Sequence, residues 1–224
     1  MAEDIKTQGI ILRRTNYGEA DRILNIITPS GKISAIAKGV RRPRSKLAGG
    51  VETFTLSDLQ IHLGRSDLGV VTGARMCQHY RHILEDYERM TLAGLVLKRI
   101  SAASEHSDTA EWFNITQQVL SALNTGMSLG LVEAWFWLNL LKSSGEEVNL
   151  YRDITGRQLE ASQQYEWDIA GEAFTPHPCG RYGANEIKLL RLMTGMGLTG
   201  VGKIRSTEGL QGKILEITRI MAKN

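Results

Sequence analysis

The residues with the clearest chemistry in this chain are basic side chains crowded between positions 38 and 46. Five cations fall within nine residues, with no acidic residue among them: Lys38, Arg41, Arg42, Arg44 and Lys46. Cations at this density repel one another in water, and a nearby polyanion relieves that repulsion. Because the run follows two strand-like segments and is not a free tail, we expect a loop that contacts nucleic-acid phosphates. The simpler alternative is a solvated charge run or a nuclear-import-like patch.

Five strand-like segments predict a β-barrel that carries this loop between two of its strands. Residues 22–28 and 32–38 alternate apolar and polar side chains around Pro29, Ser30 and Gly31, which is the pattern of a β-hairpin. The other strands are expected at residues 5–14, 54–63 and 69–77. Five short strands with glycine-rich turns predict a small closed barrel of the OB type over residues 1–79.

Two glycine positions are expected to shape this barrel. Gly9 lies inside a strand, where a bulge or a tight bend would help a small barrel to close. Residues 48–50, Ala-Gly-Gly, are expected to form a flexible joint after the basic loop.

From about residue 80 the apolar spacing changes to that of helices. Helices are expected at residues 81–104, 109–124 (with Asp108 as N-cap), 130–143, 184–193 and 210–221. Residues 145–183 are irregular, with β-like runs at 157–159 and 171–175, and a glycine-rich joint is expected at 195–202. The predicted fold class is therefore α+β: an N-terminal five-stranded OB-type barrel, residues 1–79, and an all-α helical domain, residues 80–224, that contains a small irregular insertion.

The helix at 130–143 is apolar on nearly all sides, which is typical of a helix in the middle of a bundle. We therefore expect Trp135, Phe136 and Trp137 in the core. The alternative is that one of these rings lines a groove for a partner protein.

Composition narrows the class of protein. The chain has 224 residues, is 42% hydrophobic and contains no apolar run long enough for a membrane span. Its first residues lack the cations of a signal peptide, and Cys77 and Cys179 provide no disulfide framework. Residues 1–80 hold 12 Lys and Arg against 7 Asp and Glu, whereas residues 81–224 hold 15 against 17. The first third of the chain is therefore expected to be the part that binds anions.

No catalytic constellation emerges from the spacing of reactive residues. The histidines are scattered, at His62, His79, His82, His106 and His177. Glu19 and Asp21 are expected to pair with Arg22 or to cap a turn, although paired carboxylates can also perform acid–base chemistry. Residues 197–204 approach a phosphate-binding loop, but Ile204 stands where a magnesium-binding hydroxyl is needed and a helix precedes the segment. No enzyme activity and no nucleotide site are expected.

The first 80 residues resemble the N-terminal part of the RecO recombination-mediator family. The similarity rests on GIILR from Gly9, YGEADRIL from Tyr17, GKISAIAKGVRRPRSKLAGG from Gly31 and LGVVTGA from Leu68. The apolar helix that ends in LNLLKSSGEE is similar to the family's central helix, and the resemblance thins after residue 150. It implies an OB domain and a helical domain that bind single- and double-stranded DNA and anneal complementary strands. It also implies action with RecR to load the RecA recombinase, without nucleotide hydrolysis.

Candidate DNA-binding residues follow from the resemblance and from the basic run. They are Arg13, Arg14, Lys38, Arg41, Arg42, Arg44 and Lys46. Tyr17 is the best candidate for stacking on a base, since OB barrels often add such stacking, and packing of its ring on the barrel is the alternative. The scarcity of aromatic residues favours contacts to the nucleic-acid backbone, and hence low sequence specificity.

The chain departs from the family in the region after the central helix. Many members carry four cysteines there as two close pairs, whereas this chain has Asp153, Ile154, Thr155 and Gly156 at the first position and only His177 and Cys179 near the second. A zinc ion needs about four ligands in tetrahedral array. We therefore expect no metal and no other cofactor, with packing in place of zinc.

The resemblance also implies partners: single- and double-stranded DNA, a RecR-like protein and the acidic tail of a single-stranded-DNA-binding protein. Candidate residues for protein partners are Lys98, Arg99, Lys188 and Arg191. The expected location is the bacterial cytoplasm, in association with the nucleoid. Two other functions remain open at this point, a protein-interaction scaffold and a nucleic-acid enzyme that uses the OB barrel for targeting.

Overall fold

A computed structural model describes residues 3–64, 66–105, 109–204 and 209–223. The chain divides into two compact units, Met1–Thr125 and Gly126–Asn224. The predicted boundary at 79/80 marks the change from strands to helices, whereas the boundary between compact units falls at 125/126. The difference arises because the first two long helices contact the strands of the first unit.

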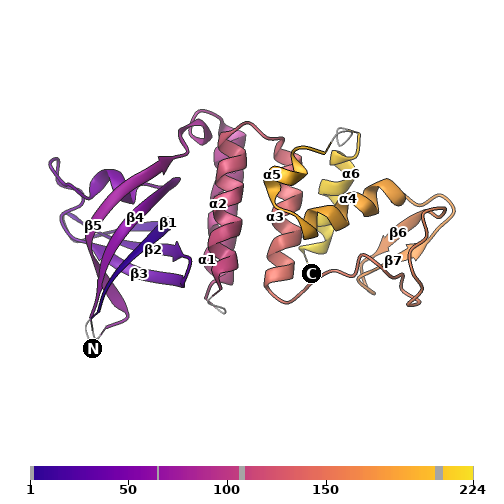
Figure 1. Ribbon diagram of the computed structural model, residues 1–224, viewed down its shortest axis with the longest axis horizontal. Coiled ribbons are helices and arrows are strands. Elements are labelled where there is room, and N and C mark those ends of the chain that lie inside the picture. Colours follow the sequence, from indigo (N-terminus) through magenta and orange to yellow (C-terminus); the bar gives the residue numbers. More distant parts are fainter. Residues whose placement is uncertain (1–2, 65, 106–108, 205–208, 224) are drawn as a thin grey trace. The chain divides into compact units, whose positions relative to one another are not determined.

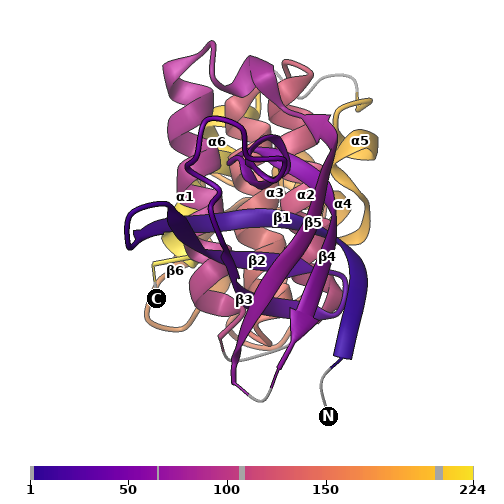
Figure 2. The same cartoon turned by 90° about the vertical axis from the view of Figure 1, so that its left-hand side faces the viewer.

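The first unit contains a closed five-stranded barrel, which confirms the predicted fold class. Its strands are β1 (Glu3–Tyr17), β2 (Asp21–Thr28), β3 (Gly31–Ala37), β4 (Thr55–Leu63) and β5 (Leu68–His79). They are ordered β1-β2-β3-β5-β4, and β4 pairs with β1 to close the barrel. All pairings are antiparallel except β3 with β5, which is parallel. Figure 2 shows β4 and β5 crossing steeply over the direction of β1 and β2, as strand tilt in a small barrel requires.

Alternate side chains of these strands fill the barrel interior. Ile11, Leu24, Ile26, Leu59 and Ile61 are buried in one apolar cluster. Fully burying such a side chain stabilises the folded state by about 1.5–3 kcal/mol before other costs are counted. The period-two pattern of the sequence therefore translates directly into an inward and an outward face of each strand.

Gly9 permits a close approach of strands, and the bulge lies elsewhere. A Cβ atom at Gly9 would lie 2.7 Å from the side chains of both Ile26 and Leu59. The register of β1 against β2 shifts between Ile11 and Arg13. The bulge therefore lies two to four residues after Gly9, and Gly9 itself is needed because there is no space for a side chain.

Two helices complete the first unit. The expected single helix at 81–104 is wrong at its start: a 3₁₀ turn, η2 (Arg81–Ile83), precedes α1 (Tyr87–Ala103). The Asp86 side chain accepts hydrogen bonds from the backbone N–H groups of Glu88 and Arg89, so the helix begins after this cap. The second helix, α2 (Ala110–Asn124), is capped by the Thr109 hydroxyl, and Asp108, the expected cap, lies outside the described residues.

The second unit is a small helical bundle with a two-stranded sheet (Figure 1). Its elements are α3 (Leu129–Ser143), β6 (Tyr165–Asp168), β7 (Ala173–Pro176), α4 (Ala184–Gly195), α5 (Leu198–Val201) and α6 (Gln211–Met221). Helix α3 packs against α4, α5 and α6. Trp135, Phe136 and Trp137 are buried, as expected for a central helix, and the Trp135 indole donates to the Met196 carbonyl oxygen at 2.9 Å.

Two expected joints are ordered turns, and the irregular region contains more structure than predicted. Residues 48–50 belong to the 3₁₀ turn η1 (Ala48–Val51), where Gly50 is buried against Ala74. Within 195–202, α5 buries Leu198 and Val201. Strand β6 was not predicted, and the expected run at 157–159 forms only an isolated bridge between Arg152 and Gln158.

No helix among the described residues is long and apolar enough to cross a membrane.

Candidate nucleic-acid interface

The basic loop that follows β3 is anchored to the barrel at both ends. Val40 and Val51 are buried in the barrel core and flank four of the five cations in the chain. The backbone N–H of Arg41 donates to the Ala20 carbonyl oxygen at 2.9 Å, and the N–H of Gly39 donates to Asp21 Oδ1 at 2.7 Å. The loop is therefore held against the turn between β1 and β2.

Successive turns order the interior of the loop. The Arg42 N–H donates to the Gly39 carbonyl oxygen at 3.1 Å, and the Ser45 N–H donates to the Arg42 carbonyl oxygen at 3.0 Å. Gly39 has φ of +63°, a conformation that glycine adopts without steric cost. Because the backbone is already ordered, less conformational entropy is lost when the loop binds a ligand.

The five cations of the loop, Lys38, Arg41, Arg42, Arg44 and Lys46, all point into solvent. Within the described part of the chain, none of them forms an ion pair with a carboxylate. Among the described residues, one polar contact of these side chains is found, a long one of 3.4 Å from Arg41 Nη1 to the Gly18 carbonyl oxygen. The loop thus presents a concentrated positive charge that the described residues of the protein do not neutralise.

The candidates on β1 differ from one another. Arg13 is exposed, whereas Arg14 forms an ion pair with Glu52, which also lies 3.6 Å from Arg22 Nη1. Tyr17, at the end of β1, is 56% exposed, so it lies on the surface. Arg14 therefore ties the end of the basic loop to β1, and its charge is already compensated.

A cavity of about 530 Å³ brings together two candidates that the sequence assigned to different partners. Arg13 comes from β1 and Lys98 from α1, and both line this cavity. Because Arg13 and Lys98 are far apart in the chain, the sequence did not indicate that they lie close together. Lys98 was predicted as a protein contact, and its neighbour Arg99 is also exposed on α1.

A second lysine, which was not among the candidates expected from the sequence, fixes α1 to the barrel beside this cavity. Lys32 Nζ lies 2.9 Å from Glu105 Oε1 and donates to the Ser101 carbonyl oxygen at 3.0 Å. Its side chain is only 12% exposed. A cation at the carboxyl end of a helix also interacts favourably with the helix dipole. The one signal for Lys32 in the sequence is its position at the start of a predicted strand, next to a turn.

The other two partner candidates lie in the second unit. Lys188 is exposed on α4. Arg191 Nε donates to the Leu150 carbonyl oxygen at 2.9 Å, and its guanidinium lies 4.6 Å from the centre of the Tyr151 ring. Arg191 is thus engaged in holding the chain that follows α3.

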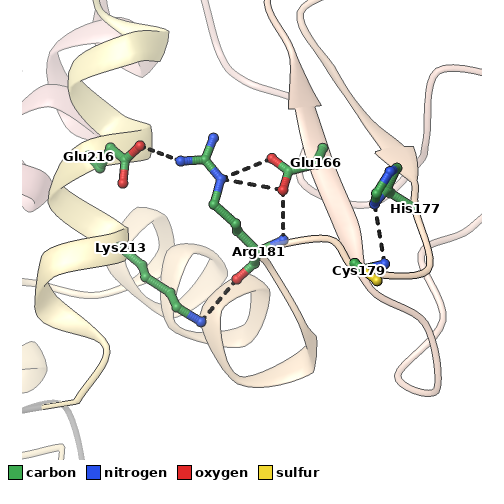
Figure 3. A network of polar contacts seen from close by, with 6 residues as sticks. All are labelled: Glu166, His177, Cys179, Arg181, Lys213 and Glu216. Atoms are coloured by element: carbon green, nitrogen blue, oxygen red, sulfur yellow. Dashed lines mark hydrogen bonds and ion pairs between the residues drawn. The ribbon is translucent and has the colours of Figure 1, made fainter.

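The region in which related chains were expected to carry zinc contains a set of ion pairs (Figure 3). Arg181 lies between Glu166, at 3.1 Å, and Glu216, at 2.5 Å, and these two carboxylates raise the pKa of its guanidinium. Lys213 Nζ donates to the Arg181 carbonyl oxygen at 3.1 Å and lies 3.0 Å from Glu186. We call these five residues the Arg181 network.

His177 and Cys179 contact each other only locally. The Cys179 backbone N–H donates to His177 Nδ1 at 3.2 Å, and both side chains are exposed. Across the described residues, no group of three or more His, Cys, Asp or Glu side chains is placed to hold a metal ion. Two neighbouring donors do not fit a tetrahedral zinc site.

Aromatic packing supports the same small sheet. Phe174 makes edge-to-face contacts with three rings, at centroid distances of 6.2 Å to Tyr165, 5.2 Å to Trp167 and 6.1 Å to Tyr182. Such pairs contribute about 0.5–1.5 kcal/mol each beyond the area that they bury. This segment is therefore stabilised by an aromatic cluster as well as by the Arg181 network.

Comparisons with known proteins agree with this architecture. The family model described as "Recombination protein O N terminal" matches residues 1–80, which are the barrel and its basic loop. The chain is 31% identical over 188 residues to the DNA repair protein RecO of Alkaliphilus metalliredigens, covering 83% of this chain and 76% of that protein. It is 29% identical over 223 residues to the DNA repair protein RecO of a Roseiflexus species, covering 96% of this chain and 78% of the relative.

A third relative matches more strongly over a shorter span. The DNA repair protein RecO of Rubrobacter xylanophilus is 37% identical over 142 residues, which is 62% of this chain and 57% of that protein. The similarity to the first two relatives extends through both compact units, so it is not confined to the barrel. The chain belongs to the RecO family.

Proposed function

We propose that this protein is a non-enzymatic mediator of DNA repair and homologous recombination. It binds single- and double-stranded DNA through the basic loop and Arg13, anneals complementary strands, and helps to load a recombinase onto protein-coated single-stranded DNA. Membership of a family whose curated relatives are named DNA repair proteins supports the repair role. The observation that carries the DNA-binding role is the set of exposed cations on an anchored loop, which form no ion pair with any described residue.

The chemistry of the loop favours contacts to phosphates over readout of bases. Lysine and arginine side chains that neutralise phosphates release condensed counterions, and this contribution does not depend on sequence. Neutralising phosphates on two strands at once would lower the repulsion between them. Annealing of complementary strands follows from that effect, and no bond-breaking step is needed.

Two protein partners belong to the proposal: a RecR-like protein and the acidic tail of a single-stranded-DNA-binding protein. Lys98, Arg99 and Lys188 are exposed cations that could contact acidic segments. A role on chromosomal DNA implies that the protein acts at the nucleoid, in the bacterial cytoplasm.

The test is a fluorescence-anisotropy titration with a labelled single strand at several salt concentrations. The triple variant Arg41→Ala, Arg42→Ala, Arg44→Ala should reduce the slope of log affinity against log salt by about 2, since each phosphate contact on a single strand contributes about 0.7. A matched control removes three exposed cations elsewhere, Arg157→Ala, Lys203→Ala and Lys223→Ala, and should leave the slope nearly unchanged. Equal slopes for both variants, or unchanged strand annealing in the loop variant, would refute the proposed role of the loop.

A further inference from the structure

The cavity beside Arg13 lies between the barrel and α1, entirely within the first unit. Residues of β1, of the segment just before β4, and of α1 form its walls. Its apolar surface comes from Leu12, Phe54 and Leu97, all largely buried. Its volume of about 530 Å³ falls in the range of about 300–1,000 Å³ found for sites that bind small ligands.

The charge at this cavity is positive. Arg13 and Lys98 are exposed, and among the described residues neither forms an ion pair with a carboxylate. The one carboxylate that lines the cavity, Glu105, is paired with Lys32 at 2.9 Å. The site therefore combines an apolar floor with two available cations, which suits a flat apolar group attached to anions.

The walls of the cavity are held in place. The Lys32 contacts fasten the carboxyl end of α1 to β3. On the other side, Phe54 has φ of +57°, an uncommon conformation for an aromatic residue, and its carbonyl oxygen accepts a hydrogen bond from the Tyr80 N–H at 3.0 Å. Rigid walls reduce the conformational entropy lost when a ligand enters.

We propose that this cavity receives one unstacked base of a single DNA strand, while Arg13 and Lys98 hold the flanking phosphates. The inference rests on the proposed function and adds a preference for single strands, because a paired base cannot leave the helix without losing its partner. Thr53 and Phe54 line the cavity and come after the basic loop and the turn η1 in the chain, so a DNA strand bound to that loop can continue to the cavity. Tyr17 is an exposed aromatic residue on β1, and the cavity provides a second place at which the barrel can hold a base.

Gly94 allows the cavity to be filled without changing its charges. It lines the cavity from an exposed position on α1, and a Cβ atom there would meet no other atom within 4 Å. The variant Gly94→Leu should therefore fold and occupy the space. Gly212→Leu is a matched control, because Gly212 is an exposed glycine on α6 with equally open surroundings.

The experiment measures binding of an intact single strand and of the same strand with abasic sites, for each protein. The unsubstituted protein should bind the abasic strand about tenfold more weakly, as expected for the loss of one base contact. Gly94→Leu should bind the intact strand at that weaker level, should not distinguish the two strands, and should keep its affinity for duplex DNA. Gly212→Leu should behave as the unsubstituted protein does.

The outcomes separate this inference from the proposed function. If Gly94→Leu binds both strands as the unsubstituted protein does, while the triple loop variant loses affinity, the base site is refuted and the phosphate-binding loop stands. If Gly94→Leu keeps its DNA affinity but loses binding of a labelled acidic peptide, the cavity serves a protein partner and the inference is refuted as well. If the loop variant also retains full affinity, both are refuted.

Discussion

The basic loop of the first unit and the Arg181 network of the second both place cations next to β-strands, yet they use their charges in opposite ways. In the loop, backbone hydrogen bonds and the buried Val40 and Val51 hold the chain, and the cations point outward. In the network, Arg181 and Lys213 are paired with carboxylates of the same unit. A cation's role therefore depends on what anchors its backbone and on whether a carboxylate is within reach.

This contrast has an energetic basis. An exposed ion pair contributes about 0–1 kcal/mol, so the Arg181 network depends on several weak pairs and on the aromatic cluster beneath it. The loop obtains its order from buried apolar side chains, which contribute more per residue. It can therefore leave its cations unpaired without losing its shape.

The largest expected effect concerns the anchor of the loop. A Cβ atom at Gly50 would lie 2.7 Å from the carbonyl carbon of Ala74, so Gly50→Ala forces the backbone to move. We expect the free energy of unfolding to fall by about 1–3 kcal/mol, as for other overpacked sites. Gly49→Ala is the control, since a Cβ atom there meets nothing within 4 Å. Urea denaturation measures both, and equal stabilities would show that the barrel does not hold the loop as described.

The next largest effect is expected when a carboxylate is introduced into the basic loop, as in the Arg181 network. Lys46→Glu places a carboxylate among the loop cations, where it can pair with neighbouring arginines and repel phosphates. We expect affinity for single-stranded DNA to fall about tenfold, against about threefold for Lys46→Gln, which only removes a charge. Titration of a labelled oligonucleotide at constant salt measures the difference. Equal losses in the two variants would contradict the idea that unpaired charge is what matters.

A smaller effect is expected in the Arg181 network. Glu186 is buried at the start of α4, where its side chain accepts hydrogen bonds from the Gly183 N–H at 3.1 Å and from Lys213 at 3.0 Å. Glu186→Ala removes a helix cap and should lower the free energy of unfolding by about 1 kcal/mol. DNA affinity should be unchanged, and a loss of affinity would place the network in the interface.

The same carboxylate predicts a dependence of stability on pH. Burial raises the Glu186 pKa, but hydrogen bonds from its own backbone N–H, from Lys213 and from the Gly183 N–H outweigh burial and hold the pKa below its usual value of 4.5. Because the folded-state pKa is the lower one, the carboxylate stabilises the folded state above pH 4.5, and this contribution is lost as pH falls through the folded-state pKa. Denaturation midpoints of Glu186→Gln and the unsubstituted protein should therefore converge at acid pH.

Much of the architecture followed from local patterns in the sequence. Period-two alternation located β2, β3 and β4, and short apolar runs located β1 and β5. The all-round apolar pattern of α3 placed Trp135 and Phe136 in a core. These predictions held because burial on one face of a strand, or on all faces of a helix, requires a matching pattern of side chains. Glycines were less informative: residues 48–50 and 195–202 suggested flexible joints, but small residues there permit close packing.

By itself, the sequence determined that five cations would share one loop after the third barrel strand, since that crowding is a property of adjacent residues. Only the tertiary structure decided which cations are available. It paired Arg14 with Glu52, fastened α1 with Lys32, and placed Arg13 beside Lys98 at one cavity. Ion pairs and cavities join residues that are distant in the chain, and their energies depend on separations of a few ångströms that no spacing along the sequence specifies.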